Sequence, residues 1–230
     1  MTKPASRGIN EPKQRRSQET LDRLLNATRE LLEETVFEDL TIQQIATRAG
    51  CSVGTFYGRF ENKDAILPRL LEMHYEEMER NVETVFADTA WNDAPLDKRV
   101  GLVVDHLASI AQRQPGLIRT LVLRNYQRPE SIPTSIRTAA QRVLSRLYDF
   151  LLECRSEMKH PDEKNAVQVG LLMVVAALRE RLVLIGATHS TALSTSNAIL
   201  IGELKHALLA YLTTPRGTIA SRKRKRNPKR

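Results

Sequence analysis

Residues 40–67 read LTIQQIATRAGCSVGTFYGRFENKDAIL and contain two short helical patterns separated by Gly50. Thr41 can cap the first helix while Gln44, three residues later, reaches back, which is the spacing of a capping box. Gly50 tolerates a positive φ and can therefore end this helix at little steric cost. Two short helices joined by such a turn have the layout of a helix-turn-helix, whose second helix enters the DNA major groove.

The second helical pattern begins after Ser52, which can cap it. Phe56 and Phe60 lie four residues apart, so we expect them to be buried together. The other flank, which a major groove would meet, carries Val53, Thr55, Tyr57 and Arg59. Any two short amphipathic helices joined by glycine show the same periodicity, so periodicity alone leaves DNA binding open.

The individual residues of this stretch resemble the DNA-binding domain of the TetR/AcrR family of bacterial transcriptional regulators. The matching positions are Thr41, Ile45-Ala46, Ala49-Gly50, Ser52, Gly54-Thr55, Phe56-Tyr57, Phe60 and Asn62-Lys63. The match is specific in combination, although no single residue in it is. The resemblance implies an all-α fold, with an N-terminal three-helix helix-turn-helix domain and a larger helical effector-binding and dimerisation domain.

The resemblance also implies which residues contact double-stranded DNA. These are Thr41, Gln43, Ser52, Val53, Gly54, Thr55, Tyr57, Arg59 and Lys63. Lys63 matches a phosphate contact, and Arg59 is the best candidate for base discrimination because arginine can pair bidentately with guanine, worth about 1–3 kcal/mol.

Two positions depart from the family pattern. At Thr35 family members commonly have a glycine, so either Thr35 takes a left-handed conformation or the turn differs. At Gly58 they usually have a larger residue, and a glycine inside a helix costs roughly 1 kcal/mol relative to alanine. The second helix of the motif is then either less stable or closer to the DNA.

Composition sets wider limits. The chain has 230 residues, 41% of them hydrophobic, which is enough for one small module and one larger core, and an aromatic content of 5% argues against a β-rich protein. No stretch approaches the ~20 apolar residues of a membrane span, and the charged start lacks the apolar region of a secretory signal. We therefore expect a cytoplasmic protein with no membrane partner. Cys51 and Cys154 lack metal-ligand spacing and are expected to be free thiols, Cys51 in the core.

The net charge of +8 is unevenly distributed. The end of the chain from residue 215 holds eight basic residues and no acid, and the first 18 residues are also basic, so the remainder is net negative. We expect a basic disordered arm over residues 1–16, the helix-turn-helix domain over 17–63, the effector-binding and dimerisation domain over 64–213, and a basic disordered tail over 214–230. Such arms favour a polyanion and salt-dependent binding, although the tail is equally interpreted as solubilising.

The apolar periodicity predicts helices along the whole chain. The first begins near Ser17, and the fourth begins at Lys63 or Asp64 and ends near Phe86. Later helices are expected over residues 96–112, 117–128, 136–158, an apolar segment at 167–185, and 195–212. The last two are too apolar for one small domain to cover, so we expect a homodimer through them, as the resemblance also implies. Its two recognition helices would meet successive major grooves about 34–36 Å apart.

The middle helices are expected to enclose a cavity for a small-molecule effector, as the resemblance implies. The candidate lining residues are His106, Leu107, Ile110, Leu117, Leu121, Tyr126, Leu147, Phe150, Leu151 and Met173. His106 is also well explained as a packed core residue. Arg124 and Arg179 either attract an anionic effector or pair with the acidic fourth helix.

A competing hypothesis is an all-helical metal enzyme. Glu203 and His206 form the Glu-x-x-His pair that di-iron four-helix proteins use, but these sites need a second such pair, and the sequence contains none. HExxH, glycine-rich phosphate loops and nucleophile elbows are also missing from it. We therefore predict no catalytic residue, metal or cofactor, and a regulator that is a repressor or, less commonly in the family, an activator. A helical scaffold without DNA binding is disfavoured by the match at residues 54–57 and 62–63.

Overall fold

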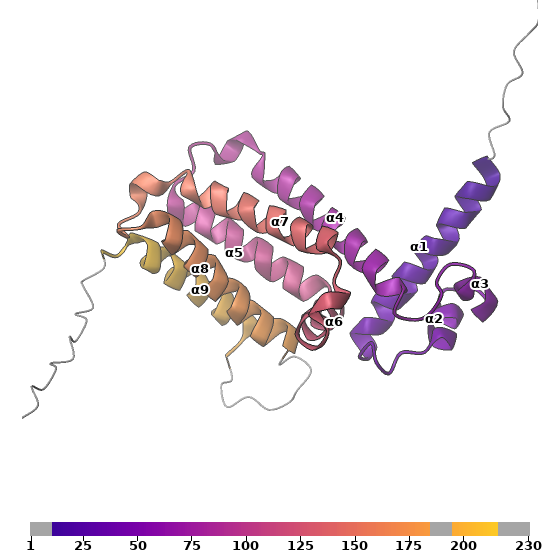
Figure 1. Cartoon of the computed structure of the whole chain (residues 1–230). Coiled ribbons are helices and arrows are strands. Elements are labelled where there is room, and N and C mark those ends of the chain that lie inside the picture. The colour runs from indigo at the N-terminus through magenta and orange to yellow at the C-terminus, as the bar shows by residue number, and fades with distance from the viewer. Residues whose placement is uncertain (1–10, 185–194, 216–230) are drawn as a thin grey trace, which may run out of the picture.

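The structure is a computed structural model that describes residues 11–184 and 195–215, and every regular element in these ranges is helical. Figure 1 shows two parts, an N-terminal head of three helices and a body in which the remaining helices form a bundle. The head comprises α1 (Glu11–Glu34), α2 (Ile42–Arg48) and α3 (Val53–Tyr57). The body comprises α4 (Ile66–Phe86), α5 (Leu96–Arg113), α6 (Pro115–Gln127), α7 (Thr134–Leu152), α8 (Glu163–Leu178), the π-helical segment η4 (Arg179–Leu184) and α9 (Asn197–Thr213). Short 3₁₀ turns lie at Thr89–Trp91, Pro129–Ser131 and Arg155–Glu157.

The head folds around one apolar face of α1. Leu24 and Leu32 on this helix are fully buried against Ile45 of α2 and Phe56 of α3. The same cluster extends into the body, where it takes in Leu70 and other residues of α4, together with Leu117, Ile132 and Ile136. The cores of the two parts therefore meet without a polar layer between them.

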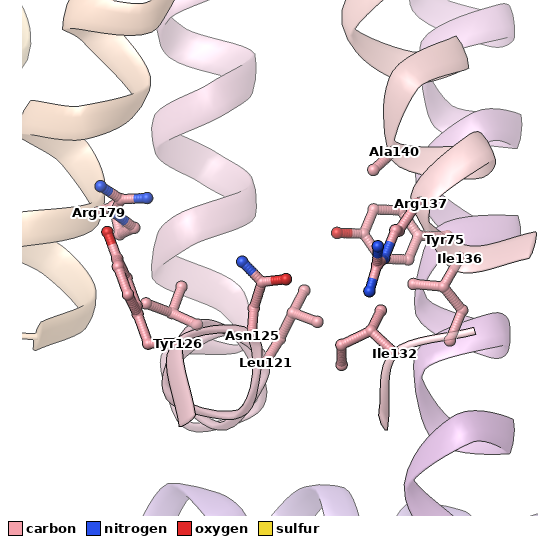
Figure 2. A pocket seen from close by; sticks show the side chains of 10 residues that line it. Tyr75, Leu121, Asn125, Tyr126, Ile132, Ile136, Arg137, Ala140 and Arg179 are labelled. Carbon is pink, nitrogen blue, oxygen red and sulfur yellow. The ribbon is translucent and has the colours of Figure 1, made fainter. Parts of the chain in front are cut away.

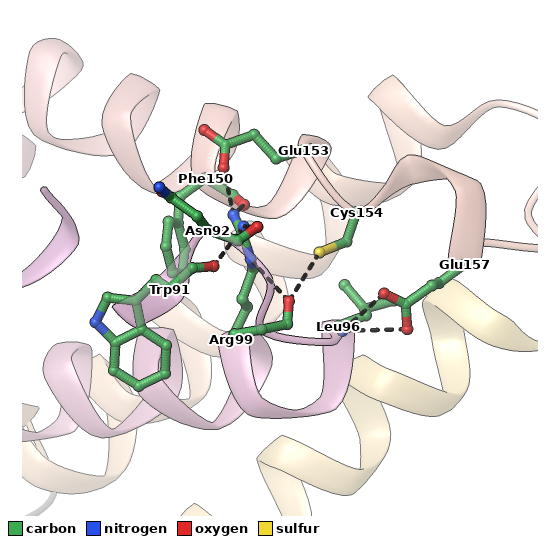
Figure 3. Close-up of polar contacts among 9 residues, drawn as sticks. Trp91, Asn92, Leu96, Arg99, Phe150, Glu153, Cys154 and Glu157 are labelled. Carbon is green, nitrogen blue, oxygen red and sulfur yellow. Dashed lines mark hydrogen bonds and ion pairs between the residues drawn. The ribbon is translucent and has the colours of Figure 1, made fainter. Parts of the chain in front are cut away.

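A second cluster fills the body, where α5 packs against α7, α8 and α9. Arg99 of α5 is almost completely buried at the end of this bundle that lies away from the head. Figure 3 shows its hydrogen bonds to the loop between α4 and α5. Its guanidinium donates hydrogen bonds to the carbonyl oxygens of Trp91, Asn92, Ala94 and Phe150, and to the carboxylate of Glu153 at 2.5 Å. A buried charge is stable when its donors are satisfied in this way.

The helix boundaries differ from the predicted ones at four places. α1 begins at Glu11, so part of the predicted disordered arm is helical, while residues 1–10 and the basic tail from residue 216 lie outside the described residues. α4 begins at Ile66, with Pro68 in its first turn, where proline is tolerated. α7 ends at Leu152 instead of continuing to residue 158, because the chain turns there and the Glu157 carboxylate accepts hydrogen bonds from the Leu96 N–H. The predicted segment 167–185 divides into α8 and η4, and residue 185 is not described.

The structure explains both positions that depart from the family pattern, Thr35 and Gly58. Among the described residues, Gly50 is the one residue with a positive φ, of 65°, so Thr35 is not left-handed and the turn after α1 differs instead. Gly58 is the C-cap of α3, with φ −69° and ψ −7°, and not a residue inside a helix. The expected helix-destabilising cost at Gly58 was therefore wrong, because the helix ends at Tyr57.

Both cysteines are free thiols, as predicted. Cys51 is half-buried and packs against the head core. Cys154 is buried in the body, where its thiol lies 3.5 Å from the Ala94 carbonyl oxygen and burial raises its pKa. A buried thiol with a raised pKa is a packing residue and not a nucleophile.

Candidate DNA-binding site and effector cavity

Helix α3 is short, and residues at both of its ends hold it in place. The Ser52 side chain caps it by accepting a hydrogen bond from the Thr55 N–H at 3.1 Å, and the two hydroxyls lie 2.9 Å apart. Phe56 is fully buried and packs against Phe60, with ring centroids 5.3 Å apart, so one flank of the helix is fixed to the head core. Tyr57, next to this anchor, is 55% exposed. The predicted division of α3 into a buried and an exposed flank is therefore observed.

Gly54 leaves the exposed surface of α3 flat. A Cβ at this position would lie 3.6 Å from the Ser52 hydroxyl, which is an ordinary contact. The fold therefore does not need a glycine here. Since no neighbouring part of the protein needs the missing side chain at Gly54, its absence can instead allow another molecule to approach the backbone.

The remaining predicted DNA contacts come from α2 and from the residues on either side of α3 and α4. Thr41 caps α2 in the predicted capping box, its N–H and hydroxyl both 2.8 Å from the Gln44 side-chain oxygen. Gln43 and Arg59 are exposed. Lys63 has a structural role that the sequence did not reveal, because its ammonium donates to the carbonyl oxygens of Phe37 and Glu38, each at 2.8 Å. An ammonium has three donors, so one remains for a phosphate.

The family described as "Bacterial regulatory proteins, tetR family" matches residues 24–70. These residues form a TetR-family domain. The resemblance deduced from the residues around Gly50 is thereby confirmed. No curated protein matches the chain.

Solved structures extend the likeness in fold from this domain to the body. The TetR-family transcriptional regulator from Agrobacterium tumefaciens is 13% identical, with a TM-score of 0.65 and coverage of 86% of this chain and 100% of that one. A TetR transcription regulator from Haloarcula marismortui is 22% identical, with a TM-score of 0.65 and coverage of 85% and 97%. The MbdR regulator from Azoarcus sp. CIB is 18% identical, with a TM-score of 0.59 and coverage of 85% and 100%. At these identities the likeness establishes the fold, which is that of a TetR-family transcriptional regulator.

The body contains an inner and an outer cavity beside α4. The inner cavity has a volume of about 230 Å³ and is lined mainly by apolar side chains of α4, α5, α6, α7, α8 and η4. The outer cavity, of about 260 Å³, opens between α6 and the start of α7, as Figure 2 shows. The two cavities are adjacent, because five residues line both: Tyr75, Leu121, Val122, Ala140 and Arg179.

Only some of the predicted lining residues reach this space. Leu107, Ile110 and Leu121 line the inner cavity, and Leu121 and Tyr126 line the outer one. The other predicted residues do not line this space, because their side chains pack between helices on either side of it or face outward, and their role in effector binding stays a prediction. Leu117 lies in the head core; Leu147, Phe150 and Leu151 lie in the body core; His106 packs edge-on against Phe86; and Met173 points outward.

Sequence reasoning missed the contribution of α4. His74, Tyr75 and Met78 line the inner cavity, and the spacing of apolar residues from Leu71 to Val82 along this helix was the signal available. His74 is buried, with its Nδ1 atom 3.2 Å from the side-chain oxygen of Gln114, and burial lowers its pKa. Burial raises the pKa of Tyr75 to about 12, so its phenol remains a hydrogen-bond donor at neutral pH.

The N-terminus of α6 makes the closest contact between head and body. The Gly116 N–H donates to both oxygens of the Glu33 carboxylate at 3.1 Å, and Arg119 donates to the Leu32 carbonyl oxygen at 3.2 Å. A Cβ on Gly116 would lie 2.0 Å from the same Leu32 oxygen. Here only glycine allows the two helices to approach so closely.

Arg124 makes a second connection between the parts. It pairs with Asp64 at 2.6 Å and lies 3.6 Å from a Glu38 oxygen, with its guanidinium over the Phe37 ring. Of the two roles expected for Arg124, the ion pair with the fourth helix is observed at Asp64, where that helix was predicted to begin, although α4 itself begins at Ile66. Arg179, by contrast, lines both cavities.

The described residues contain no group of three or more His, Cys, Asp or Glu side chains arranged to hold a metal ion. Glu203 and His206 are both exposed on α9. Nor does any helix in the described ranges combine the length and apolar character needed to cross a membrane.

Proposed function

We propose that this protein is a dimeric, sequence-specific transcriptional regulator that a small molecule releases from a palindromic operator. The observation that carries the proposal is the exposed flank of α3 around Tyr57, presented by a TetR-family domain whose first helix is packed against a body with a cavity. Repression is the commoner outcome in the family that the sequence resembles. Activation by the same fold is the alternative, and a reporter gene carrying the operator distinguishes the two.

Binding to the DNA just upstream of the protein's own gene tests the DNA-binding part. We expect saturable binding that exceeds binding to unrelated DNA and weakens steeply with salt, because basic groups release counterions from the phosphates. Tyr57→Ala should remove the preference for the operator. Tyr126→Ala removes a tyrosine of the body that is 71% exposed, compared with 55% for Tyr57, and as the control it should leave DNA binding unchanged in the absence of a cavity ligand. Equal binding to all DNA that survives Tyr57→Ala would refute sequence-specific recognition through α3.

The dimer is supported by apolar side chains on the outer faces of α8 and α9. Leu172 is 67% exposed, Met173 46% and Ile199 57%. The outward face of α9 also presents the small residues Ala207 and Ala210, which permit close helix packing. α8 and α9 are neighbours, and large exposed apolar patches mark interaction sites. We infer that two copies pair through these helices and so present two α3 helices to successive major grooves.

Light scattering tests the dimer directly. We expect the mass of two chains for the wild type and of one chain for Leu172→Glu, because a buried unpaired carboxylate destabilises the interface. Gln18→Glu adds the same charge at an exposed position of α1, in the head, and should remain a dimer. A wild type that is monomeric at micromolar concentration would refute the proposal.

Effector control is supported by the course of α4. Its first turns, with Leu67 and Leu70, belong to the head core, whereas Val82 and Phe86 belong to the body core. Tyr75 lies between them and lines the cavity. A molecule in the cavity therefore contacts the helix that carries the head, and it releases DNA if it binds the DNA-incompetent arrangement more tightly.

A further inference from the structure

The cavity has an uneven distribution of charge. Its inner part is lined mainly by aliphatic side chains from five helices and η4. Among the residues lining the two parts, there is no aspartate or glutamate, whereas Arg137 and Arg179 both contribute guanidinium groups. An apolar chamber with a cationic opening selects molecules that have an apolar body and an anionic end.

Arg179 lies where the two parts of the cavity join. Its Nε atom is buried and has no hydrogen-bond partner among the described residues, and no ion pair is formed by its side chain within those ranges. Arg137 differs, because it is exposed and already donates to the Pro129 carbonyl oxygen. A buried, unpaired guanidinium N–H is costly, so an anion that pairs with Arg179 gains more than one that pairs with Arg137.

The backbone at Arg179 is also unusual. Arg179 is the first residue of η4, a π-helical segment, and Val183 in the same segment lines the inner cavity. π-helical turns are rare and occur frequently at functional sites. The irregular backbone and the unpaired donor therefore coincide at one position of the cavity wall.

Further donors surround the same space. Figure 2 shows the Tyr75 phenol and the Asn125 amide directed into the opening, with Arg179 and Tyr126 on one side of it and Arg137 on the other. The Tyr75 phenol stays protonated at neutral pH and can donate to a carboxylate oxygen.

We propose that the cavity binds an amphipathic monocarboxylate, with its carboxylate paired to Arg179 and its apolar body in the inner part. A cavity of about 150 Å³ holds a benzene ring, so the 230 Å³ of the inner part suits a body of about ten non-hydrogen atoms. The regulatory meaning of this binding rests on the proposed function, whereas the binding itself does not.

Calorimetric titration of the full-length protein tests the proposal without DNA. The probes are octanoate and phenylacetate, each compared with its uncharged amide, octanamide and phenylacetamide, which have the same shape. We expect at least one carboxylate to bind about tenfold more tightly than its amide, because a charge-assisted hydrogen bond distinguishes them. A preference for octanoate or for phenylacetate identifies the apolar body as aliphatic or aromatic.

Three variants locate the bound molecule. Arg179→Gln should abolish the difference between carboxylate and amide, whereas Arg137→Gln removes an equal charge at the rim and should retain it. Ala140→Leu, at the junction of the two parts, should weaken carboxylate and amide alike. Helicity and the thermal midpoint are measured for each variant to establish that it is folded.

Equal binding of carboxylates and amides by the wild type would overturn the proposal, and this comparison needs no variant. Undiminished selectivity in folded Arg179→Gln would overturn it as well. A protein that binds octanoate or phenylacetate but no operator refutes the regulator function and leaves the carboxylate site standing. A protein that binds its operator but neither octanoate nor phenylacetate refutes the carboxylate site and leaves the regulator function standing.

Discussion

Gly116→Ala should loosen the contact between head and body. The added Cβ would lie 2.0 Å from the Leu32 carbonyl oxygen, 2.4 Å from its carbonyl carbon and 2.9 Å from the Glu33 nitrogen, all of them backbone atoms. Because an ordinary contact begins near 3.4 Å, the N-terminus of α6 must retreat by more than 1 Å from the end of α1. That displacement breaks the hydrogen bonds from the Gly116 N–H to the Glu33 carboxylate.

The steric clash and the lost hydrogen bonds together determine the expected loss of stability. Overpacking of this kind costs about 1–3 kcal/mol, and a lost hydrogen bond to a charged group about 1.5–3 kcal/mol, so we expect a loss of roughly 3–5 kcal/mol in the free energy of unfolding. For a chain of this length, the thermal midpoint should fall by roughly 10 °C.

Urea unfolding followed by circular dichroism measures the loss. Gly101→Ala is the matched control, because a Cβ on Gly101, inside α5, meets nothing within 4 Å and should be neutral or slightly stabilising. Equal stability of the two variants would refute the steric argument. Where Gly116→Ala folds, its DNA affinity should also respond less to ligands of the cavity, because α6 no longer presses on α1.

Three other changes probe separate features of the chain. Arg99→Met should lower the free energy of unfolding by about 3 kcal/mol in a urea titration, because the buried carbonyl oxygen of Phe150 and three partly buried carbonyl oxygens lose their donor, and a loss below about 1 kcal/mol would contradict this. Stability should decline as the pH falls below 6.5, the ordinary pKa of histidine, because burial lowers the pKa of His74 and the unfolded chain takes up the proton first. His74→Gln should remove the contribution of His74 to this decline, which is up to about 1.4 kcal/mol per pH unit. Urea titrations at pH 7.5 and 5.5 measure it, and the same change in the free energy of unfolding for variant and wild type would contradict the prediction. Gly54→Ala should leave the free energy of unfolding equal or higher, and should weaken operator binding about tenfold in a gel-shift assay. Gly101→Ala is the control and should leave operator binding unchanged. Unchanged operator binding by Gly54→Ala would show that DNA does not approach this backbone closely.

The sequence predicted the local structure of the head well because short-range chemistry determines it. The capping box at Thr41, the positive φ of Gly50 and the Ser52 cap each depend on residues a few positions apart, and all three are observed. The end of α3 at Tyr57 was missed because helical periodicity continues through Phe60, whose N–H still bonds to the Phe56 carbonyl oxygen.

The cavity was predicted less well because its lining depends on how helices rotate against one another. Leu147 and Leu144 lie one turn apart on α7, yet only Leu144 lines the inner cavity, while Leu147 faces the body core. Periodicity identifies the apolar face of a helix but not which part of that face remains uncovered. The contact at Gly116 was missed for a related reason, since nothing near it in the sequence indicates a neighbour from α1.

The shared core between head and body limits how this protein can be re-engineered. Leu117, Ile132 and Ile136 complete the core that Leu24 and Phe56 begin. A fragment cut after α4 would expose this apolar surface to water. A chimaera that transplants the head onto another helical body must therefore carry matching residues on the acceptor's sixth and seventh helices. The head and the packing of these helices are inherited together in this chain, and they would have to be exchanged together.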